Sequence, residues 1–165
     1  MAATPRLGLP FLSVGQAQKE FTHNEALQTI DALVSGAVEE PPRPSPPAAP
    51  ALGACYIIAD GATDAWAGMS NSLAAWTSGG WRFIAATEGM SLYERTSGTW
   101  MTFRNGGWES GTLRGSALLI GGQQVVGPRA AAIESPTGGA TIDAESRTAI
   151  DAILGTLRQH GLIET

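Results

Sequence analysis

The sequence predicts a mainly β fold with flanking helices. A Trp/Gly-rich antiparallel β meander, forming a small barrel or sandwich, is expected between an N-terminal and a C-terminal helix. All five tryptophans fall between Trp66 and Trp108, in runs of β-branched and aromatic residues separated by glycine turns. Apolar residues recur at helical spacing on both sides of that region. Hydrophobic residues make up 43% of the chain and charged residues 15%, which is typical of a folded protein.

Residues 1–40 are expected to form an arm followed by a helix. The first eleven residues contain two prolines and no periodicity, which favours an extended arm. Possible capping boxes begin at Ser13 and Thr22, and they predict a helix over about 14–35 with Gly36 as its end. The apolar positions at helical spacing are Ala26, Leu27, Ile30, Leu33 and Val34.

Residues 41–53 are predicted to be a linker. Prolines are dense between Pro41 and Pro50, and their fixed φ angles and missing N–H donors suit a stiff, extended connector. The β domain is then expected over residues 54–127.

The turns of the meander predict its register. A two-residue turn at Ser97-Gly98 would place Arg95 opposite Trp100 and Tyr93 opposite Thr102. The remaining predicted pairs are Leu92 with Phe103, Phe103 with Trp108 across Asn105-Gly106, and Trp76 with Trp81 across Ser78-Gly79. One face would carry the core residues Leu92, Met101, Phe103 and Trp108, and the other Tyr93, Arg95, Trp100 and Thr102. The direction in which Trp76 and Trp81 face stays open.

Residues 128–165 are expected to form a loop and a helix. Asp143 is a good N-cap, Glu145 complements the helix dipole, and Gly161 follows the last turn. The apolar stripe consists of Ala149, Ile150, Ile153, Leu154 and Leu157. Of these, Ile150, Ile153, Leu154 and Leu157 are the candidates for oligomerisation or helix packing. Their spacing fits a short parallel bundle and equally a helix that packs on its own β domain.

Charge and hydropathy argue against several partners. The net charge is −5 and the arginines are scattered, so neither nucleic acid nor an anionic membrane is expected to bind. No apolar run approaches about 18 residues and no signal-peptide pattern is visible, so membrane insertion is not expected either.

The sequence contains few candidate catalytic residues. One cysteine and two distant histidines provide no metal-ligand set, so no metal or other cofactor is expected. Asp60, Asp64, Glu88 and Glu94 could in principle supply a carboxylate pair for glycoside hydrolysis, but their spacing is not specific for it. We therefore expect a protein without enzymatic activity.

The aromatic residues favour a binding surface. Five tryptophans cannot all be interior in so small a meander, and exposed indole or phenol rings can stack on the C–H faces of sugars. The candidate glycan-binding residues are Trp100, Tyr93, Arg95, Thr102 and Trp66.

Three stretches resemble a domain of unknown function found in alphaproteobacterial phages and gene transfer agents. The most specific is the opening, with Leu9-Pro10-Phe11, Gln16-Ala17-Gln18-Lys19-Glu20 and His23-Asn24-Glu25-Ala26-Leu27. The middle stretch comprises residues 60–63, 65–68 and 79–83, and the ending residues 139–145 and 157–163.

The resemblance implies a virion or gene-transfer-agent appendage, a head spike or tail-fibre component that contacts cell-surface polysaccharide such as capsule. Such a protein would be made in the bacterial cytoplasm without a signal peptide and would sit on the particle surface. It would contact other particle proteins, with Phe21, Leu27 and Ile30 as candidate docking residues, and form a homo-oligomer, with a trimer favoured. The alternative is a purely structural adaptor without glycan binding; a polysaccharide-degrading enzyme is least favoured.

Overall fold

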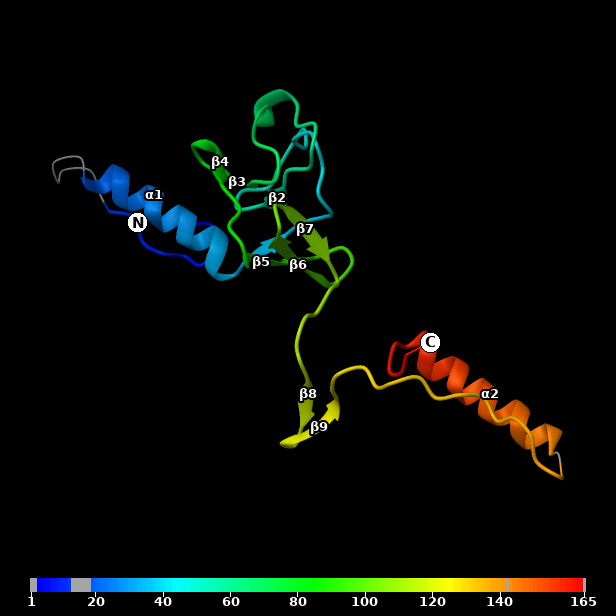
Figure 1. Cartoon of the computed structure of the whole chain (residues 1–165). Coiled ribbons are helices and arrows are strands. Elements are labelled where there is room, and N and C mark those ends of the chain that lie inside the picture. Colours follow the sequence, from blue (N-terminus) through cyan, green and yellow to red (C-terminus); the bar gives the residue numbers. More distant parts are fainter. Residues whose placement is uncertain (1–2, 13–18, 142, 165) are drawn as a thin grey trace. The chain divides into compact units, whose positions relative to one another are not determined.

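The computed structural model describes residues 3–12, 19–141 and 143–164 (Figure 1). The chain divides between Thr112 and Leu113 into two compact units, here called the N-terminal and C-terminal units. The sequence-based boundary at residue 127 differs from this division, because the hairpin after Thr112 belongs with the C-terminal helix.

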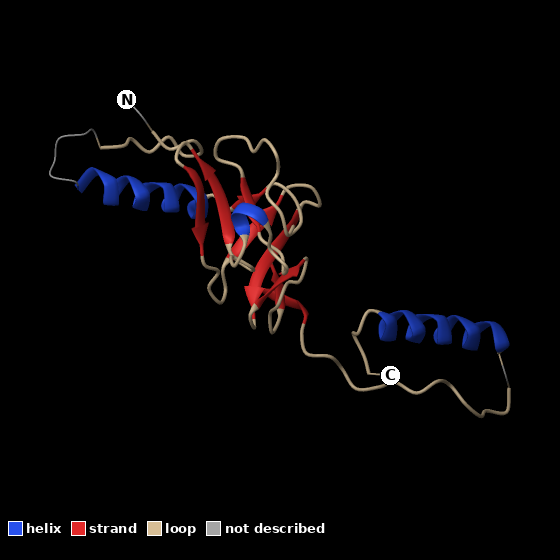
Figure 2. Cartoon of the chain, turned by 90° about the horizontal axis from the view of Figure 1, so that it is seen from above, coloured by secondary structure: helices blue, strands red, loops and turns tan. Residues whose placement is uncertain are grey.

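The predicted fold class is confirmed. The described residues form three sheets and two α-helices, without a closed barrel, and a small sandwich-like fold fits the sheets (Figure 2). The helices are α1 (Lys19–Val34), the 3-10 helix η1 (Asp64–Trp66) and α2 (Ala144–Gln159). The strands are β1 (Ala37–Val38), β2 (Cys55–Ile57), β3 (Leu73–Thr77), β4 (Gly80–Ile84), β5 (Ser91–Glu94), β6 (Thr99–Arg104), β7 (Gly107–Ser110), β8 (Leu118–Ile120) and β9 (Gln123–Val126). Within these residues, neither α-helix is long and apolar enough to cross a membrane.

The core of the N-terminal unit lies between two sheets. One sheet has the order β1-β5-β6-β7, with β1 parallel to β5, and the other has the order β2-β3-β4. Both contribute to one buried cluster, which includes Val38, Ile57, Leu73, Leu92 and Met101. A second cluster, around Tyr56 and Trp66, covers the other face of β2 and β3. These two strands are therefore buried on both sides, which explains their nearly continuous apolar sequence.

The proline-rich segment, predicted to be a stiff extended connector, contains no named strand and touches the β domain at an isolated bridge. Arg43 lies beside Ile58 as a parallel bridge, donating its N–H to Ile57 O and accepting from Ala59 N. Pro44 O accepts a hydrogen bond from Thr63 N. The prolines supply extended backbone and Arg43 supplies the donor that they lack, so the segment pairs along the β domain.

Two of the three predicted turn registers are confirmed. Trp76 pairs with Trp81, and Phe103 pairs with Trp108. The third is wrong, because residues 95–98 form a four-residue connection and Tyr93 pairs with Trp100. The shift amounts to two positions along β6, which preserves the predicted faces because side chains alternate with a period of two.

Helix α1 presents polar residues to the rest of its unit. Asp31 is buried and accepts hydrogen bonds from the Thr4 hydroxyl and from the backbone N–H groups of Arg6 and Leu7. Ala32 belongs to the buried core cluster, and Leu33 packs against it. Other members of the predicted apolar stripe, including Ile30 and Val34, are exposed. The capping box expected at Ser13 lies outside the described residues.

The C-terminal unit combines the β8–β9 hairpin with α2. Asp143 is the N-cap of α2 as expected, because its carboxylate accepts from Ser146 N at 2.8 Å. Among the described hydrophobic residues of this unit, the buried side chains are Leu154 and Ile163. Every residue of β8 and β9 is exposed.

Candidate functional site

The strongest candidate is a pair of exposed aromatic rings on the outer surface of the four-stranded sheet. Tyr93 and Trp100 pair across β5 and β6, with exposed fractions of 38% and 52%. Their ring centroids are 5.7 Å apart and the ring planes meet at 70°, an edge-to-face arrangement. The neighbouring residues Leu92 and Met101 are buried on the core side. Alternation along the strands therefore turns both rings away from the core.

Hydroxyl groups lie beside the two rings. The hydroxyl oxygens of Ser91 and Thr102 are 3.2 Å apart, and these residues form the pair two positions from Tyr93–Trp100 along the ladder, on the same face. We call Ser91, Tyr93, Trp100 and Thr102 the aromatic face. It combines apolar ring surface with groups that donate and accept hydrogen bonds.

Glu94 fixes the connection next to this face. Its carboxylate accepts from the Ser97 hydroxyl, from Thr96 N at 2.6 Å and from Ser97 N at 3.1 Å. The hydrogen bond from the Ser97 hydroxyl, followed by those from the two backbone N–H groups, lowers the pKa of Glu94 below its ordinary value despite the opposing effect of burial. The carboxylate thus organises residues 95–98, which is why a two-residue turn does not form.

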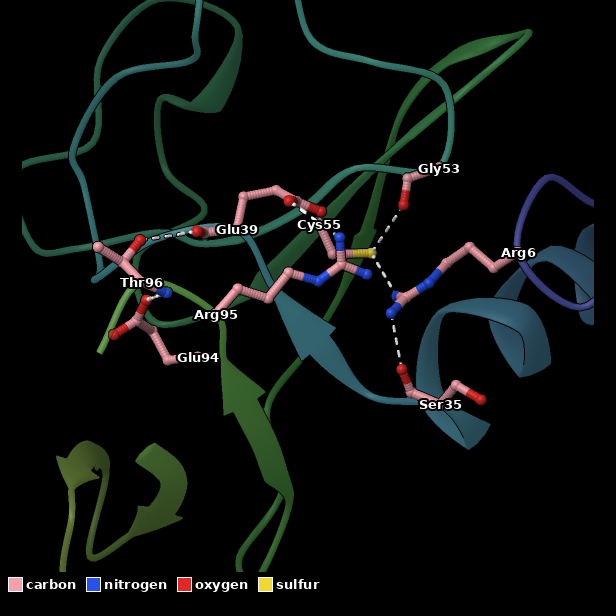
Figure 3. Close-up of polar contacts among 8 residues, drawn as sticks. All are labelled: Arg6, Ser35, Glu39, Gly53, Cys55, Glu94, Arg95 and Thr96. Carbon is pink, nitrogen blue, oxygen red and sulfur yellow. Dashed lines mark hydrogen bonds and ion pairs between the residues drawn. The ribbon is translucent and has the colours of Figure 1, made fainter. Parts of the chain in front are cut away.

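Arg95 lies in this connection and not opposite Trp100. Its Nη1 is 3.2 Å from Glu39 Oε2 (Figure 3). Its backbone N–H donates to Val38 O. The Thr96 hydroxyl also donates to the backbone oxygen of Glu39. These contacts attach the connection to the end of β1, so Arg95 is held at the edge of the sheet.

Arg6 approaches from the N-terminal arm. Its guanidinium donates to Ser35 O at 2.6 Å and contacts Cys55 Sγ at 3.1 Å (Figure 3). A third contact, to Ala32 O at 3.3 Å, places its charge at the C-terminal end of α1, where the helix dipole favours a cation. Burial raises the pKa of the Cys55 thiol, although Arg6 opposes the shift. Cys55 is therefore a buried core residue, as its apolar strand predicts.

Trp66 does not belong to the candidate surface, and its assignment as a glycan contact is corrected. It has no exposed area, because it packs against Tyr56 and Trp81 at centroid distances of 5.9 and 5.1 Å. The ring centroids of Trp76 and Trp81 are 4.8 Å apart. The two residues pair across β3 and β4 and face the same side of the β2-β3-β4 sheet as Trp66, a direction that the sequence left open. Trp81 is half-buried and packs against the buried cluster that contains Trp66, and Trp76 is also half-buried.

The candidate contact residues of α1 and α2 differ in how much of each side chain is exposed. Phe21 is 69% exposed and Ile30 is also exposed, whereas Leu27 is half-buried. On α2, Ile150 and Ile153 are exposed, Leu157 is half-buried and Leu154 is buried within its own unit. The α2 stripe is therefore divided between internal packing and an accessible surface.

Metal binding finds no support in the part of the chain that the structure describes. No group of three or more His, Cys, Asp or Glu residues is placed there to hold a metal ion.

Sequence reasoning did not predict that Arg6 and Arg95 line the same cavity in the N-terminal unit. The two residues are far apart in sequence, and no local pattern signals that both line one cavity.

Comparison with known proteins identifies a family. No curated protein matches the chain. A family described as a protein of unknown function, DUF2793, matches residues 23–109. This range begins within α1 and ends within β7, so it includes the aromatic face and covers more than half of the 165 residues. The chain therefore belongs to the DUF2793 family.

Proposed function

We propose that the chain is a non-enzymatic appendage protein of a virion or gene transfer agent, a head-spike or tail-fibre component that attaches to cell-surface polysaccharide. The observation that carries the proposal is the exposed Tyr93–Trp100 pair on the outer side of a sheet whose other side packs against the core. An exposed aromatic pair costs solubility and adds nothing to the core, so a partner is its simplest explanation.

The chemistry of the aromatic face suits a sugar. Indole and phenol rings offer flat apolar surface to the C–H faces of pyranose rings, and Ser91 and Thr102 offer hydroxyl groups to sugar hydroxyls. Such a shallow contact is weak for one copy. Several copies on one particle would strengthen it, because linked sites raise the effective concentration.

The exposed apolar residues of the helices supply the remaining parts of the proposal. Phe21 and Ile30 would dock α1 onto another particle protein, and Ile150 and Ile153 would join copies of the chain, with a trimer favoured. The hairpin β8–β9 supports self-association, since an isolated two-stranded hairpin is marginally stable in water.

A binding assay with encapsulated cells tests the aromatic face. Purified chains carrying Trp100→Ala with Tyr93→Ala should lose most binding to the cells and to their purified capsule. The matched control is Phe21→Ala, which removes an exposed aromatic residue from α1 and should leave cell binding unchanged while reducing incorporation into particles.

The same variants separate the rival functions. If the double variant binds cells normally but fails to enter particles, the chain is a structural adaptor and the attachment proposal is wrong. If purified capsule incubated with the wild-type chain is shortened, the chain is an enzyme. Unchanged polymer length, measured by size-exclusion chromatography, is the expected result.

A further inference from the structure

A cavity of about 440 Å³ lies in the N-terminal unit, where the arm, the end of α1 and the sheet edge meet. Its lining includes Arg6, Ser35, Ala37, Glu39, Gly53 and Arg95. We call it the two-arginine cavity. Figure 3 shows Arg6 and Arg95 entering this region from different parts of the chain, with Glu39 beside Arg95.

Part of the two-arginine cavity, the part lined by Ala37 and Arg95, lies on the same side of the sheet as the aromatic face. Ala37, which lines the cavity, pairs with Tyr93, and Tyr93 pairs with Trp100. Val38 is buried, so Ala37 points to the outer side with the two rings. Arg95 follows Tyr93 by two residues, which corresponds to about 7 Å along a strand. A short oligosaccharide could therefore contact both features at once.

The side chains that line the cavity carry one more positive than negative charge, and the buried carboxylate of Asp31 lies behind the lining, where it accepts from the backbone N–H of Arg6. Arg6 and Arg95 are opposed by Glu39, whereas the chain as a whole carries a net charge of −5. The Arg95 side chain is 52% exposed and forms one ion pair, so most of its N–H groups remain available. The Arg6 guanidinium donates to the backbone oxygens of Ala32 and Ser35 at the C-terminal end of α1.

We propose that this side of the sheet binds an acidic saccharide. A carboxylate of the sugar chain enters the two-arginine cavity and accepts hydrogen bonds from Arg95, with the charge of Arg6 behind it, while a neighbouring sugar ring stacks on Trp100. The guanidinium group presents its donors in a plane that matches a carboxylate. This inference rests on the proposed function and adds the charge class of the glycan.

Calorimetric titration of the full chain with uronic acid oligomers tests this assignment. The probes are tetramers of galacturonate and of mannuronate, each compared with its neutral methyl ester. At least one acid is expected to bind about fivefold or more tightly than its ester at low salt, and the difference should shrink as salt screens the charges. Equal binding of acid and ester, or no binding of either acid up to about 10 mM, would overturn the inference.

Variants of the cavity should shift acid binding in opposite directions. Arg95→Gln should weaken it about fivefold, the size expected of a partly exposed ion pair. Glu39→Gln removes the competing carboxylate and should strengthen it, an effect that a purely structural role of Glu39 would not produce. Arg104→Gln is the matched control, because it makes the same change at an exposed arginine outside the cavity lining and should have no effect.

The inference and the proposed function can fail separately. If Trp100→Ala abolishes binding of acid and ester alike while Arg95→Gln changes neither, attachment through the rings stands and the acidic ligand is rejected. If Arg95→Gln weakens acid binding while Trp100→Ala has no effect on the tetramers or on cells, the two-arginine cavity binds carboxylates and the aromatic face is not the attachment surface.

Discussion

The two units of the chain differ in how much of their apolar surface they bury. The N-terminal unit closes two clusters around β2 and β3 and leaves few large apolar side chains of its strands exposed, Tyr93 and Trp100 among them. The C-terminal unit buries Leu154 and Ile163 among its described hydrophobic residues and exposes both strands of its hairpin. The first unit has the interior of an independent fold, whereas the second has too little buried surface to be stable alone.

Exposed apolar residues therefore have a different significance in the two units. In the N-terminal unit the exposed rings are exceptions on a packed sheet, which is the basis for proposing that they bind a ligand. In the C-terminal unit exposure is general among the described apolar residues, which is the basis for proposing that further copies of the chain cover them.

The largest effect is expected for Trp66→Ala. Removal of the buried ring leaves a cavity within the second cluster, and should reduce the free energy of unfolding of the N-terminal unit by about 3–5 kcal/mol. Trp100→Ala, a change of the same size on the outer side, should cost less than about 1 kcal/mol. Chemical denaturation monitored by circular dichroism measures both. Equal losses would contradict the division into core and surface tryptophans.

Next in size is the effect of charge on the exposed stripe of α2. Ile150→Asp with Ile153→Asp should convert an oligomer into monomers, because burying the two carboxylates would be unfavourable. Thr148→Asp adds a charge at another exposed position of the helix and should leave the mass unchanged. Light scattering gives the mass of each variant. A wild-type chain that is already monomeric would show that the C-terminal unit does not obtain its missing interior from copies of itself.

The smallest expected effect is the contribution of Glu94 to the loss of stability at acid pH. Its pKa is lowered in the folded state, so its contribution to stability is present above the ordinary glutamate pKa and is lost as the pH falls through the lowered value. The unfolding temperature of the wild type should therefore decline more steeply below the ordinary pKa than that of Glu94→Gln. Parallel curves for the two proteins would mean that the carboxylate does not organise residues 95–98.

Several parts of the fold could be predicted because the signal is local. Asn105 and Gly106 both adopt positive φ angles, as a tight hairpin turn requires, and the pair Phe103–Trp108 follows from that turn. The N-cap of α2 is equally local, since Asp143 lies three residues before the N–H that it accepts from.

The errors arise where side-chain contacts that composition and periodicity do not reveal decide the outcome. The four-residue connection after Glu94 depends on a buried carboxylate, and the pairing of Arg43 depends on an unoccupied edge beside Ile58. Burial of Trp66 follows from η1, a single turn without periodicity. The faces of β5 and β6 were nevertheless predicted correctly, so Tyr93 and Trp100 could be identified from sequence while the two-arginine cavity could not.

The parallel pairing of β1 with β5 has a mechanical consequence. Gly36 and Val38 accept hydrogen bonds from Tyr93 and Arg95, so the chain leaving α1 is attached directly to the strand that carries the aromatic face. Tension between a particle that holds α1 and a cell that holds Trp100 would pass from β1 through β5 to β6, the strand of Trp100, and would load the hydrogen bonds of both ladders. Strand β7, at the far edge of the sheet, would lie outside the line of force.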